Sequence, residues 1–499
     1  MNSTRKQTVR VAAVDLGASS GRIVAVSIGA DQLTYDEVHR FPNNAVPIRD
    51  GLYWDILGIY REVMIGLRSA SSRLPLDAIG IDSWAVDFGL LDRLGNLIGN
   101  PRSYRDPYSL AGQRRLLEAT NPDELYARTG IQQQPFNTAC QLLACAETGL
   151  LDTADKILLL PDLLAYWMTG QMAAERTNAS TTQLYDVSTG SWALTLLDHL
   201  SLPSHILPAL VDPGFFVGNV SLGISERDVA PANQVPVIAV CSHDTASAVV
   251  AVPANGADFA FISSGTWSLV GVEVNTPILT PEARAAGFTN EAGIDGTTRF
   301  LTNVMGLWVL SECQRHWKDR RYAALGTELL IDEAICHPPL SCVIDINDPR
   351  LLAATTFDTD PMPTRITELA AESGEPIPDT PGEIARCVID SLALAYRRAV
   401  SDVARLTGRS IEVIHIVGGG SRHPELCQLT ADSCEIPVLA GPSEATAIGN
   451  ALVQARALGG GIHDRDSMRS LIRRTHRLMR YQPRSGGSWA DAERRVYGR

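Results

Sequence analysis

Two stretches of the sequence, far apart along the chain, consist of two apolar runs joined by a small, hydroxyl-rich glycine turn. Residues 14–26 read VDLGASSGRIVAV, and residues 259–274 read FAFISSGTWSLVGVEV. In both, the residues that follow the turn are β-branched and alternate in polarity, which predicts a returning strand. We therefore expect two β-hairpins. In the first, backbone N–H groups and the hydroxyls of Ser19 and Ser20 form a concave set of donors suited to a phosphate.

The glycines of the first hairpin also fit three other sites, and the returning strand argues against each of them. GASSG matches the G-x-S-x-G pattern of a serine hydrolase, with Ser19 as nucleophile. A nucleophile elbow, a dinucleotide-binding loop and a P-loop all run from a strand directly into a helix, and no helix start follows Gly21. A P-loop also needs a Gly-Lys pair, whereas none of the three lysines in the chain follows a glycine. A phosphate-binding hairpin remains, although most glycine-serine hairpin turns are only turns.

Composition describes an ordinary globular protein and argues against several classes of partner. The 499 residues suffice for two or more domains, each with its own core. A net charge of −13 argues against nucleic acid or an anionic membrane surface as the main partner. It does not argue against ATP, which a local pocket lined with N–H groups can bind. No apolar run reaches the roughly 18 residues of a membrane-spanning helix.

The nine cysteines are scattered, and the first residues, MNSTRKQTVR, lack the apolar centre of a signal peptide. An odd number of cysteines without an export signal predicts reduced thiols and a cytoplasmic location. Cys336, His337 and Cys342 come nearest to a metal cluster, but their spacing favours incidental thiols. The expected partners are small molecules, and the chain is expected to be a monomer or a small homo-oligomer.

The order of predicted elements indicates an α/β fold in each half. The first hairpin is followed by a strand at 32–41, a helix at 54–70 and a buried strand at 78–92. Two such halves, each a sheet covered by helices, would leave a ligand cleft between them.

The second half repeats the plan. The second hairpin is followed by a long amphipathic helix at 381–407 and then by a strand, a glycine-rich loop, a helix and a strand over 412–440. Ser421 is the expected N-cap of the helix in that segment. A last helix, at 443–460, ends in glycines.

Four motifs stand at the ends of predicted strands: DLGASSGR, CSHDTASA, SSGTWSL and VGGGSRHPELCQLTAD. Further segments, IGIDSWAVDFGLLD, PFNTACQLLA and NVMGLWVL among them, occur between these in a sensible order along the chain. Together they resemble the FGGY family of carbohydrate kinases, within the actin–hexokinase superfamily, over about residues 10–455. The resemblance implies two ribonuclease-H-like (actin-like ATPase) α/β domains with a ligand cleft between them. Residues 1–250 would form the sugar and phosphate side, 251–460 the nucleotide side, and 461–499 a C-terminal extension.

The same resemblance implies an enzyme that transfers a phosphoryl group from ATP, with Mg²⁺, to a hydroxyl of a ketose or polyol. Phosphoryl transfer needs a base near the acceptor and stabilisation of charge around the γ-phosphate. By resemblance Asp244 is that base, and Asp15 holds Mg²⁺ through water, although Asp15 could instead be a turn residue. The implied ATP-binding residues are Ala18, Ser19, Ser20, Gly21, Arg22, Thr266, Ser311 and Gly419.

For the sugar, the resemblance implies contacts from Ala85, His243, Asp244, Thr245 and Asn303. Two positions depart from the family pattern. Ala85 stands where a glycine is expected beside the sugar, which puts fine specificity in doubt, and Ser311 stands where a glutamine contact to the nucleotide is expected. The rival functions are a serine hydrolase acting through Ser19 and a non-catalytic, actin-like ATP-binding protein. The sugar-side residues argue against the second.

Overall fold

The computed structural model describes residues 8–49, 51–223, 234–318, 327–352, 360–484, 486 and 488–498. The chain forms two compact α/β units, and neither is continuous in sequence. The first unit takes its described residues from 1–255, 273–300 and 445–476, and the second takes them from 256–272, 301–444 and 477–499. The predicted fold class, two α/β domains, is confirmed.

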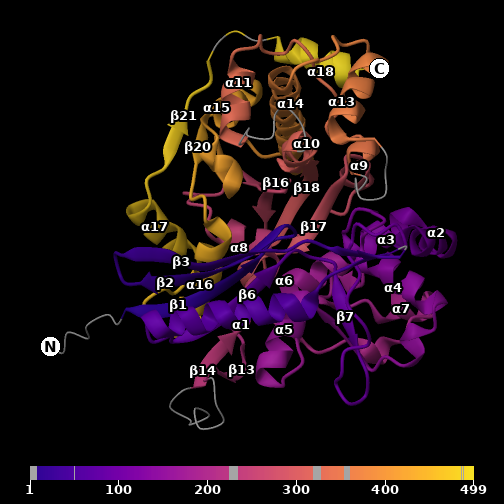
Figure 1. Cartoon of the computed structure of the whole chain (residues 1–499), viewed down its shortest axis with the longest axis vertical. Coiled ribbons are helices and arrows are strands. Elements are labelled where there is room, and N and C mark those ends of the chain that lie inside the picture. Colours follow the sequence, from indigo (N-terminus) through magenta and orange to yellow (C-terminus); the bar gives the residue numbers. More distant parts are fainter. Residues whose placement is uncertain are drawn as a thin grey trace. The chain divides into compact units, whose positions relative to one another are not determined.

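A six-stranded sheet lies at the centre of the first unit, in the order β13-β14-β6-β1-β2-β3 (Figure 1). β1 (Val9–Leu16) and β2 (Ser20–Ile28) are antiparallel and form the first predicted hairpin. β3 (Leu33–Pro42) pairs with β2, and β6 (Ala78–Ser83) runs parallel to β1 on its other side. Because β2 returns as a strand, the strand-to-helix turn of a serine hydrolase is absent from the described hairpin.

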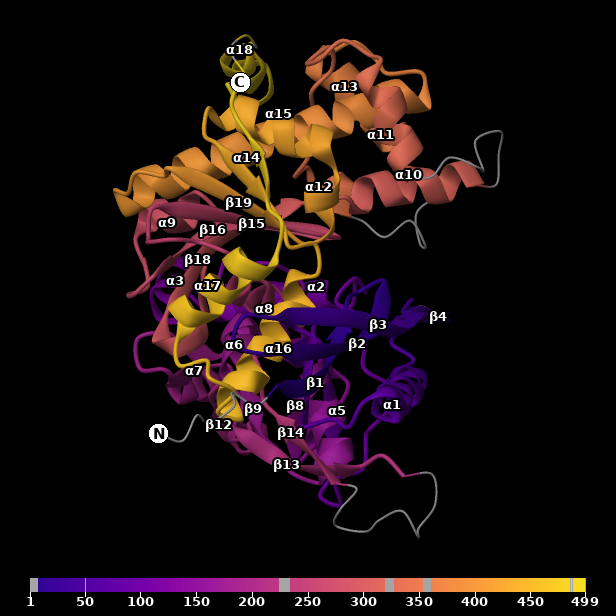
Figure 2. The same ribbon diagram turned by 90° about the vertical axis from the view of Figure 1, so that its left-hand side faces the viewer.

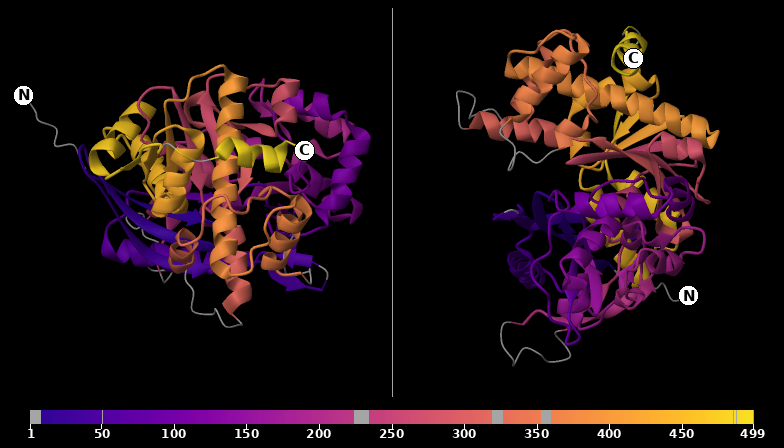
Figure 3. Two further views of the ribbon diagram at one scale, coloured as in Figure 1. Left: turned by 90° about the horizontal axis from the view of Figure 1, so that it is seen from above. Right: turned by 90° about the vertical axis from the view of Figure 1, so that its right-hand side faces the viewer.

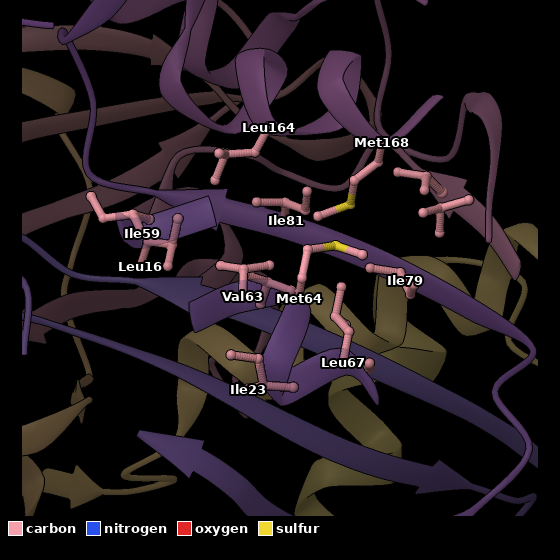
Figure 4. Packing of buried hydrophobic residues seen from close by; sticks show 14 of the residues in the cluster. Leu16, Ile23, Ile59, Val63, Met64, Leu67, Ile79, Ile81, Leu164 and Met168 are labelled. Carbon is pink, nitrogen blue, oxygen red and sulfur yellow. The ribbon is translucent and has the colours of Figure 1, made fainter. Parts of the chain in front are cut away.

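The core of the first unit lies between this sheet and α1 (Ile56–Arg73) with α5 (Leu160–Thr169). The apolar residues of α1 recur every three or four positions, so one face of the helix packs on the sheet. Figure 4 shows this packing, in which side chains of α1 and α5 meet those of the strands: Leu16, Ile23, Ile59, Val63, Met64, Leu67, Ile79, Ile81, Leu164 and Met168.

The opposite face of the sheet carries α8 (Asp244–Val250) and α16 (Ala445–Ala457), which lie next to each other in Figure 2. Two glycines allow this approach. A Cβ on Gly449 would come within 1.8 Å of the carbonyl oxygen of Ser247, and a Cβ on Gly80 would come within 2.6 Å of the Asn450 amide oxygen. Larger residues would therefore push α16 away from α8 and from β6.

A second, seven-stranded sheet has the order β17-β18-β16-β15-β19-β20-β21, and most of its strands belong to the second unit. β15 (Phe259–Ser264) and β16 (Trp267–Val274) are antiparallel and form the second predicted hairpin. β19 (Val413–Val417) runs parallel to β15.

The long helix of this unit, α14 (Pro381–Thr407), has the bounds expected from the sequence (Figure 3). Thr380 and Glu383 form a capping box at its start, and Gly408 ends it in the left-handed conformation.

Two expectations are wrong in detail. Residues 78–92 do not form one strand: β6 ends at Ser83, and β7 (Phe88–Leu91) pairs with β8 (Lys156–Leu159) in a separate two-stranded sheet. Ser421 is not the N-cap of α15 (Pro424–Cys434). It lies in a 3₁₀ turn where its hydroxyl donates to the carbonyl of Gly418, and His423 takes the capping position. Pro424 at the first helical position sets the start of this helix.

The remaining helices and strands complete the two units. In the first unit they are β4 (Val46–Ile48), β5 (Gly51–Tyr53), α2 (Ser109–Ala119), α3 (Pro122–Thr129), α4 (Thr138–Glu147), β9 (Ala174–Glu175), α6 (Arg176–Ala179), β10 (Tyr185–Asp186), β11 (Ser191–Trp192), α7 (Leu194–His199), β12 (Leu210–Val211), β13 (Phe216–Ser221), β14 (Gln234–Ile238), α9 (Pro281–Ala285), β17 (Phe288–Ala292) and α17 (Arg465–Thr475). In the second they are α10 (Trp308–Lys318), α11 (Thr327–Ile335), α12 (Pro349–Leu352), α13 (Met362–Ser373), β20 (Val438–Ala440), β21 (Met479–Tyr481) and α18 (Trp489–Tyr497), while β18 (Thr298–Met305) contributes residues to both.

Candidate active site

Three carboxyl groups gather at one edge of the sheet in the first unit. Asp15 in β1 and Asp82 in β6 are register partners in adjacent parallel strands. Asp244 is the first residue of α8, and a backbone bridge between Ser83 and His243 holds the start of that helix beside the end of β6. The negative charges of Asp15 and Asp244 both add to the burial that raises the pKa of Asp82. The sheet topology thus brings together acids that are far apart in sequence.

Asp244 directs one carboxylate oxygen toward the protein and leaves the other available. Its Oδ1 accepts the N–H of Thr245 at 2.5 Å and the Thr245 hydroxyl at 3.1 Å, and it lies 3.3 Å from Nε2 of His243. Within the described ranges no residue donates to its Oδ2. Burial raises the pKa of Asp244, against the lowering effect of His243, and the charge of Asp15 raises it further. The side chain is still 31% exposed, so a substrate can reach it.

The first hairpin carries an ion pair that the sequence analysis missed. Nε and Nη2 of Arg22 donate to Oδ2 of Asp15 at 2.9 and 2.6 Å. Burial works against the charge of Arg22, but Asp15 outweighs it and raises the pKa of the guanidinium. The two residues are register partners across the hairpin, so the pair could have been found from the strand pairing.

Asn43, just after β3, donates two hydrogen bonds to the turn of this hairpin. Asn43 donates its side-chain amide to the carbonyl of Gly17 and its backbone N–H to that of Ser19, while Ser19 itself remains exposed. A Cβ on Gly21 would come within 2.3 Å of the Phe41 ring. Gly21 therefore has a packing role in addition to the predicted contact with phosphate. Ala18 and Ser20, also predicted to bind ATP, are half-buried in the same turn.

Asp82 is fully buried and has partners from the far end of the chain. Asn450 in α16 donates to its Oδ2 at 2.6 Å, and Gln454 donates both to Asn450 and to the carbonyl of Ala12 in β1. The Oδ1 atom of Asp82 has no hydrogen-bond partner in the part of the chain that the structure describes. Nothing in the motif around Asp82 identified its partners, which lie about 370 residues away.

His243 contacts carboxylates at both ring nitrogens. Its Nε2 faces Asp244, and its Nδ1 lies 3.2 Å from Oε2 of Glu291 in β17 and 3.2 Å from Nη2 of Arg299 in β18. Arg299 pairs with Glu291 at 2.9 Å and is almost completely buried. Burial opposes ionisation of Glu291, but Arg299 and His243 together outweigh it and hold its pKa below the usual value. Neither Glu291 nor Arg299 could be predicted as a site residue, because FTNEAG and TTRF match no motif with a known chemical role.

The segment before Asp244 is tethered by another buried carboxylate. Glu175 accepts the N–H and the hydroxyl of Ser242, both at 2.9 Å, and the N–H of Thr177. Thr177 in turn accepts the N–H of His243 at 3.5 Å. Burial raises the pKa of Glu175, which these donors partly offset. The network fixes the backbone from which His243 and Asp244 project.

Ala85, which the sequence predicts to contact the sugar, lies in a tight turn after β6. Val86 follows it with a φ of 69°. This left-handed conformation is a strained one for a β-branched residue. The carbonyl of Val86 accepts the Thr138 hydroxyl at 2.7 Å and the Gln141 amide at 3.3 Å, and these bonds help to hold the turn.

Asp87 completes this turn beneath two tryptophans. Its Oδ2 accepts the indole N–H groups of Trp54 at 2.7 Å and Trp84 at 2.9 Å, and the two rings lie 4.4 Å apart between centroids. Burial raises the pKa of Asp87 to about 6, although these indoles and Gln141 act in the opposite direction. The wall that carries Ala85 is therefore a rigid, hydrogen-bonded layer.

Four of the predicted residues lie in the second unit. Thr266 occupies the turn between β15 and β16, and its carbonyl accepts the N–H of Trp308 at the start of α10. Ser311 is exposed in the first turns of that helix, and Asn303 lies half-buried in β18. Gly419 is exposed in the loop after β19.

Close backbone approach shapes the predicted nucleotide side. A Cβ on Gly306 would come within 2.4 Å of the Thr266 carbonyl oxygen, and a Cβ on Gly420 would come within 2.1 Å of the Ser264 hydroxyl. Gly418 adopts a φ of 80°, which favours glycine. The glycine-rich loop and the second hairpin are thus packed against each other within this unit.

Among the residues that the structure describes, no three or more His, Cys, Asp or Glu side chains are arranged so that they could hold a metal ion by themselves. Cys342 lies beside Cys387, with their sulfur atoms 3.3 Å apart, rather than in a metal cluster with Cys336 and His337. In the described residues, no helix has both the length and the apolar character needed to cross a membrane.

Comparison with protein families gives two matches that together cover most of the chain. Residues 11–251 match the N-terminal domain, and residues 260–458 the C-terminal domain, of the FGGY family of carbohydrate kinases.

Among curated proteins, "Rhamnulokinase" of Bacteroides thetaiotaomicron is 40% identical over 483 residues, covering 96% of this chain and 97% of that protein. "Rhamnulokinase" of Enterococcus faecalis is 41% identical, covering 90% of this chain and 89% of that protein.

Solved structures with low sequence identity have the same fold. A ligand-bound xylulose kinase from Lactobacillus acidophilus superposes with a TM-score of 0.76 at 16% identity, covering 98% of this chain and 96% of that one. A glycerol kinase from Plasmodium falciparum, solved with ADP, superposes with a TM-score of 0.72 at 14% identity, covering 96% of this chain and 95% of that one.

Proposed function

The chain belongs to the FGGY family of carbohydrate kinases, and from this premise we propose that it transfers the γ-phosphoryl group of ATP to O1 of L-rhamnulose. The products are L-rhamnulose 1-phosphate and ADP. Identities of about 40% to proteins named rhamnulokinase, over nearly the full length of both chains, support this acceptor. The observation that carries the chemistry is Asp244, a partly exposed carboxylate whose Oδ2 has no donor among the described residues.

In the proposed reaction Asp244 acts as general base. The O1 hydroxyl of the ketose gives its proton to Oδ2 as O1 forms a bond to the γ-phosphorus, and the bond between that phosphorus and the β,γ-bridging oxygen breaks to release ADP. Because Thr245 donates twice to Oδ1, and His243 lies 3.3 Å from it, the carboxylate cannot rotate freely away from the acceptor. A raised pKa makes this carboxylate a stronger base than an ordinary aspartate.

The site also fits the Mg²⁺ ion that such a transfer requires. Asp15 and Asp82 are adjacent carboxyl groups, and Oδ1 of Asp82 is buried without a partner in the described structure, which is an arrangement a cation would satisfy. Two protein carboxylates suit Mg²⁺, which keeps several of its waters. When bound, the ion would neutralise charge on the β- and γ-phosphates. Ala18 to Arg22 and Thr266, from the two hairpins, would donate to the phosphates.

The test is ADP release measured over a panel of ketoses, aldoses and polyols. We expect L-rhamnulose to be the best acceptor, with fuculose, fructose and xylulose weaker, because a wrong epimer leaves buried polar groups unpaired. Fastest release with glycerol, xylulose or an aldose would assign another acceptor within the same family. No release with any sugar or polyol would overturn the proposed activity.

The matched variant is Asp244→Asn, which keeps the shape and removes the base. We expect turnover to fall by about 10²- to 10⁴-fold while calorimetric binding of the ketose is nearly unchanged. A variant that keeps more than about a tenth of the rate would show that Asp244 is not the base.

Ala85→Gly should change the KM for the sugar more than the KM for ATP, since Ala85 is proposed to contact the sugar.

A further inference from the structure

Glu291 and Arg299 contact His243, the residue before the proposed base Asp244. Neither lies in one of the motifs that indicate function. Both come from the segment 288–300, in β17 and β18, and both belong to the first unit together with His243 and Asp244. Their side chains are 8% and 1% exposed. Both side chains lie 3.2 Å from Nδ1 of His243, the ring nitrogen on the side away from Asp244.

The contacts around the ring constrain where its protons lie. Nε2 faces Oδ1 of Asp244, which as an ionised carboxylate can only accept a hydrogen bond. A bare Nε2 would set a lone pair against that oxygen, so this nitrogen must carry a proton when Asp244 is ready to act as a base. Asp244 in turn feels the charge of Asp15 in β1, and Asp82 in β6 feels the charge of Asp244, so this side of the ring borders a group of acids.

Nδ1 has a suitable neighbour whether the ring is neutral or charged, so that Nε2 can carry a proton in both states. In the neutral ring Nδ1 is an acceptor, and Nη2 of Arg299 is a donor 3.2 Å away. In the charged ring Nδ1 carries a proton, and Oε2 of Glu291, which has no hydrogen-bond partner among the described residues, lies 3.2 Å away within ion-pair distance. Because the arginine and the carboxylate stand side by side at Nδ1, Nε2 keeps its proton in both cases.

We propose that Glu291 and Arg299 are positioning residues that act through His243: they orient the ring and keep a proton on Nε2, so that His243 always donates to Oδ1 of Asp244. Oδ2 is then the oxygen that receives the proton of the acceptor hydroxyl. This inference rests on the proposed role of Asp244 for its catalytic meaning. The assignment of the ring proton does not depend on which sugar is the substrate.

The arrangement gives the fully buried Arg299 a role beside His243. A neutral side chain at position 299 that can accept a hydrogen bond would allow the proton to move to Nδ1. Nε2 would then present a lone pair to Asp244, and the carboxylate would lose a donor and turn. A displacement of about 1 Å at a reacting group can lower a rate about a hundredfold.

The first experiment needs no variant. Histidine labelled with ¹⁵N in the ligand-free full chain gives a two-bond proton–nitrogen correlation whose pattern distinguishes the two neutral tautomers, and the signal of His243 is assigned by its loss in His243→Asn. We expect the Nε2–H pattern, or that of the doubly protonated ring, at every pH where the protein is folded. An Nδ1–H tautomer would overturn the proposal.

The second experiment measures kinetics with the sugar that releases ADP fastest, whatever that sugar is. Arg299→Gln should move the His243 signal toward the Nδ1–H pattern and lower kcat about tenfold to a hundredfold, with little change in the KM for ATP. The matched control is Arg365→Gln, because Arg365 is equally buried but donates to backbone carbonyls in the second unit. A folded Arg299→Gln protein with an unchanged tautomer and unchanged kcat would contradict the proposal. If that variant does not fold, the wild-type spectrum still decides.

Discussion

The two hairpins have the same local structure but differ in the charged side chains that they carry. The first, between β1 and β2, carries charge: Asp15 and Arg22 pair across it, and Asp82 lies beside it. The second, between β15 and β16, has no charged residue from 259 to 268, and glycines of neighbouring loops pack against its backbone. Each hairpin turn therefore supplies N–H groups and hydroxyls but no charge of its own. The charged groups come from the strands: Asp15 from β1, Arg22 from β2 and Asp82 from the neighbouring β6.

Asp15→Asn should have the largest effect on the first hairpin. It would remove the charge that pairs with the mostly buried guanidinium of Arg22, and removing one member of a buried ion pair costs about 3 kcal/mol. Hydrogen exchange of β1 and β2, followed by mass spectrometry, measures the loss. The double variant with Arg22→Gln should recover part of it. We also expect a higher Mg²⁺ concentration at half-maximal rate, and unchanged Mg²⁺ dependence would make Asp15 a structural residue only.

The first unit should lose stability as pH rises from about 4 to about 6. Burial raises the pKa of Asp87 to about 6, whereas an aspartate in the unfolded chain titrates near about 3.9. Between these two pKa values the folded state keeps a proton that the unfolded state has released. The free energy of unfolding therefore falls as pH rises, by at most about 3 kcal/mol once the pH is above about 6. In the second unit Arg386 offsets the burial of Asp390, so a smaller change is expected.

Regional hydrogen exchange, corrected for the chemical exchange rate at each pH, measures this difference between the units. Asp87→Asn is the matched variant. It should make protection in the first unit less dependent on pH over this range. If protection in the first unit depends on pH equally in the variant and the wild type, other buried acids cause the dependence. Asp162 and Glu175 are such acids, since burial raises the pKa of each.

Gly306→Ala tests the packing of the second hairpin. The added Cβ would meet the backbone of Thr266 and Trp267 at 2.4 and 2.7 Å, so the turn must shift. We expect a loss of about 1–3 kcal/mol and a higher KM for ATP. Gly265→Ala is the control within the same turn, since its nearest neighbour would be 3.8 Å away. Equal effects of the two variants would argue against a steric role for Gly306.

Thr266→Val should have the smallest effect. It keeps the shape of the turn and removes one hydroxyl that is proposed to contact a phosphate, which costs about 1 kcal/mol. We expect the KM for ATP to rise about fivefold, with the KM for the sugar and the exchange of β15 unchanged. A change confined to kcat would place Thr266 in the transition state rather than in nucleotide binding.

Elements set by local chemistry could be predicted from the sequence. The hairpins follow from alternation around a glycine turn, and α14 follows from its apolar spacing, its capping box and Gly408. The single strand expected over 78–92 was wrong because Val86 looks like a strand residue. Its left-handed conformation is held by Thr138 and Gln141, which lie more than 50 residues away.

The site could be predicted only where its residues fall within motifs. Asp15, His243 and Asp244 stand at strand ends, and the topology places all three in the first unit. Glu175, Glu291 and Arg299 could not be found this way, because each becomes meaningful only through a contact with His243 or its neighbour Ser242. A buried charge has to be paired, but the sequence does not say with which partner.

The dependence of Asp82 on Asn450 has a consequence for how the protein is made. Residues 445–476 belong to the first unit, yet the ribosome delivers them only after all of 301–444. Until then β6 lacks the helix that covers it and donates to Asp82. The first unit therefore begins to be synthesised first but completes its fold late, and a nascent chain stalled before residue 445 would present an unfinished face of its sheet to the chaperones of the cell.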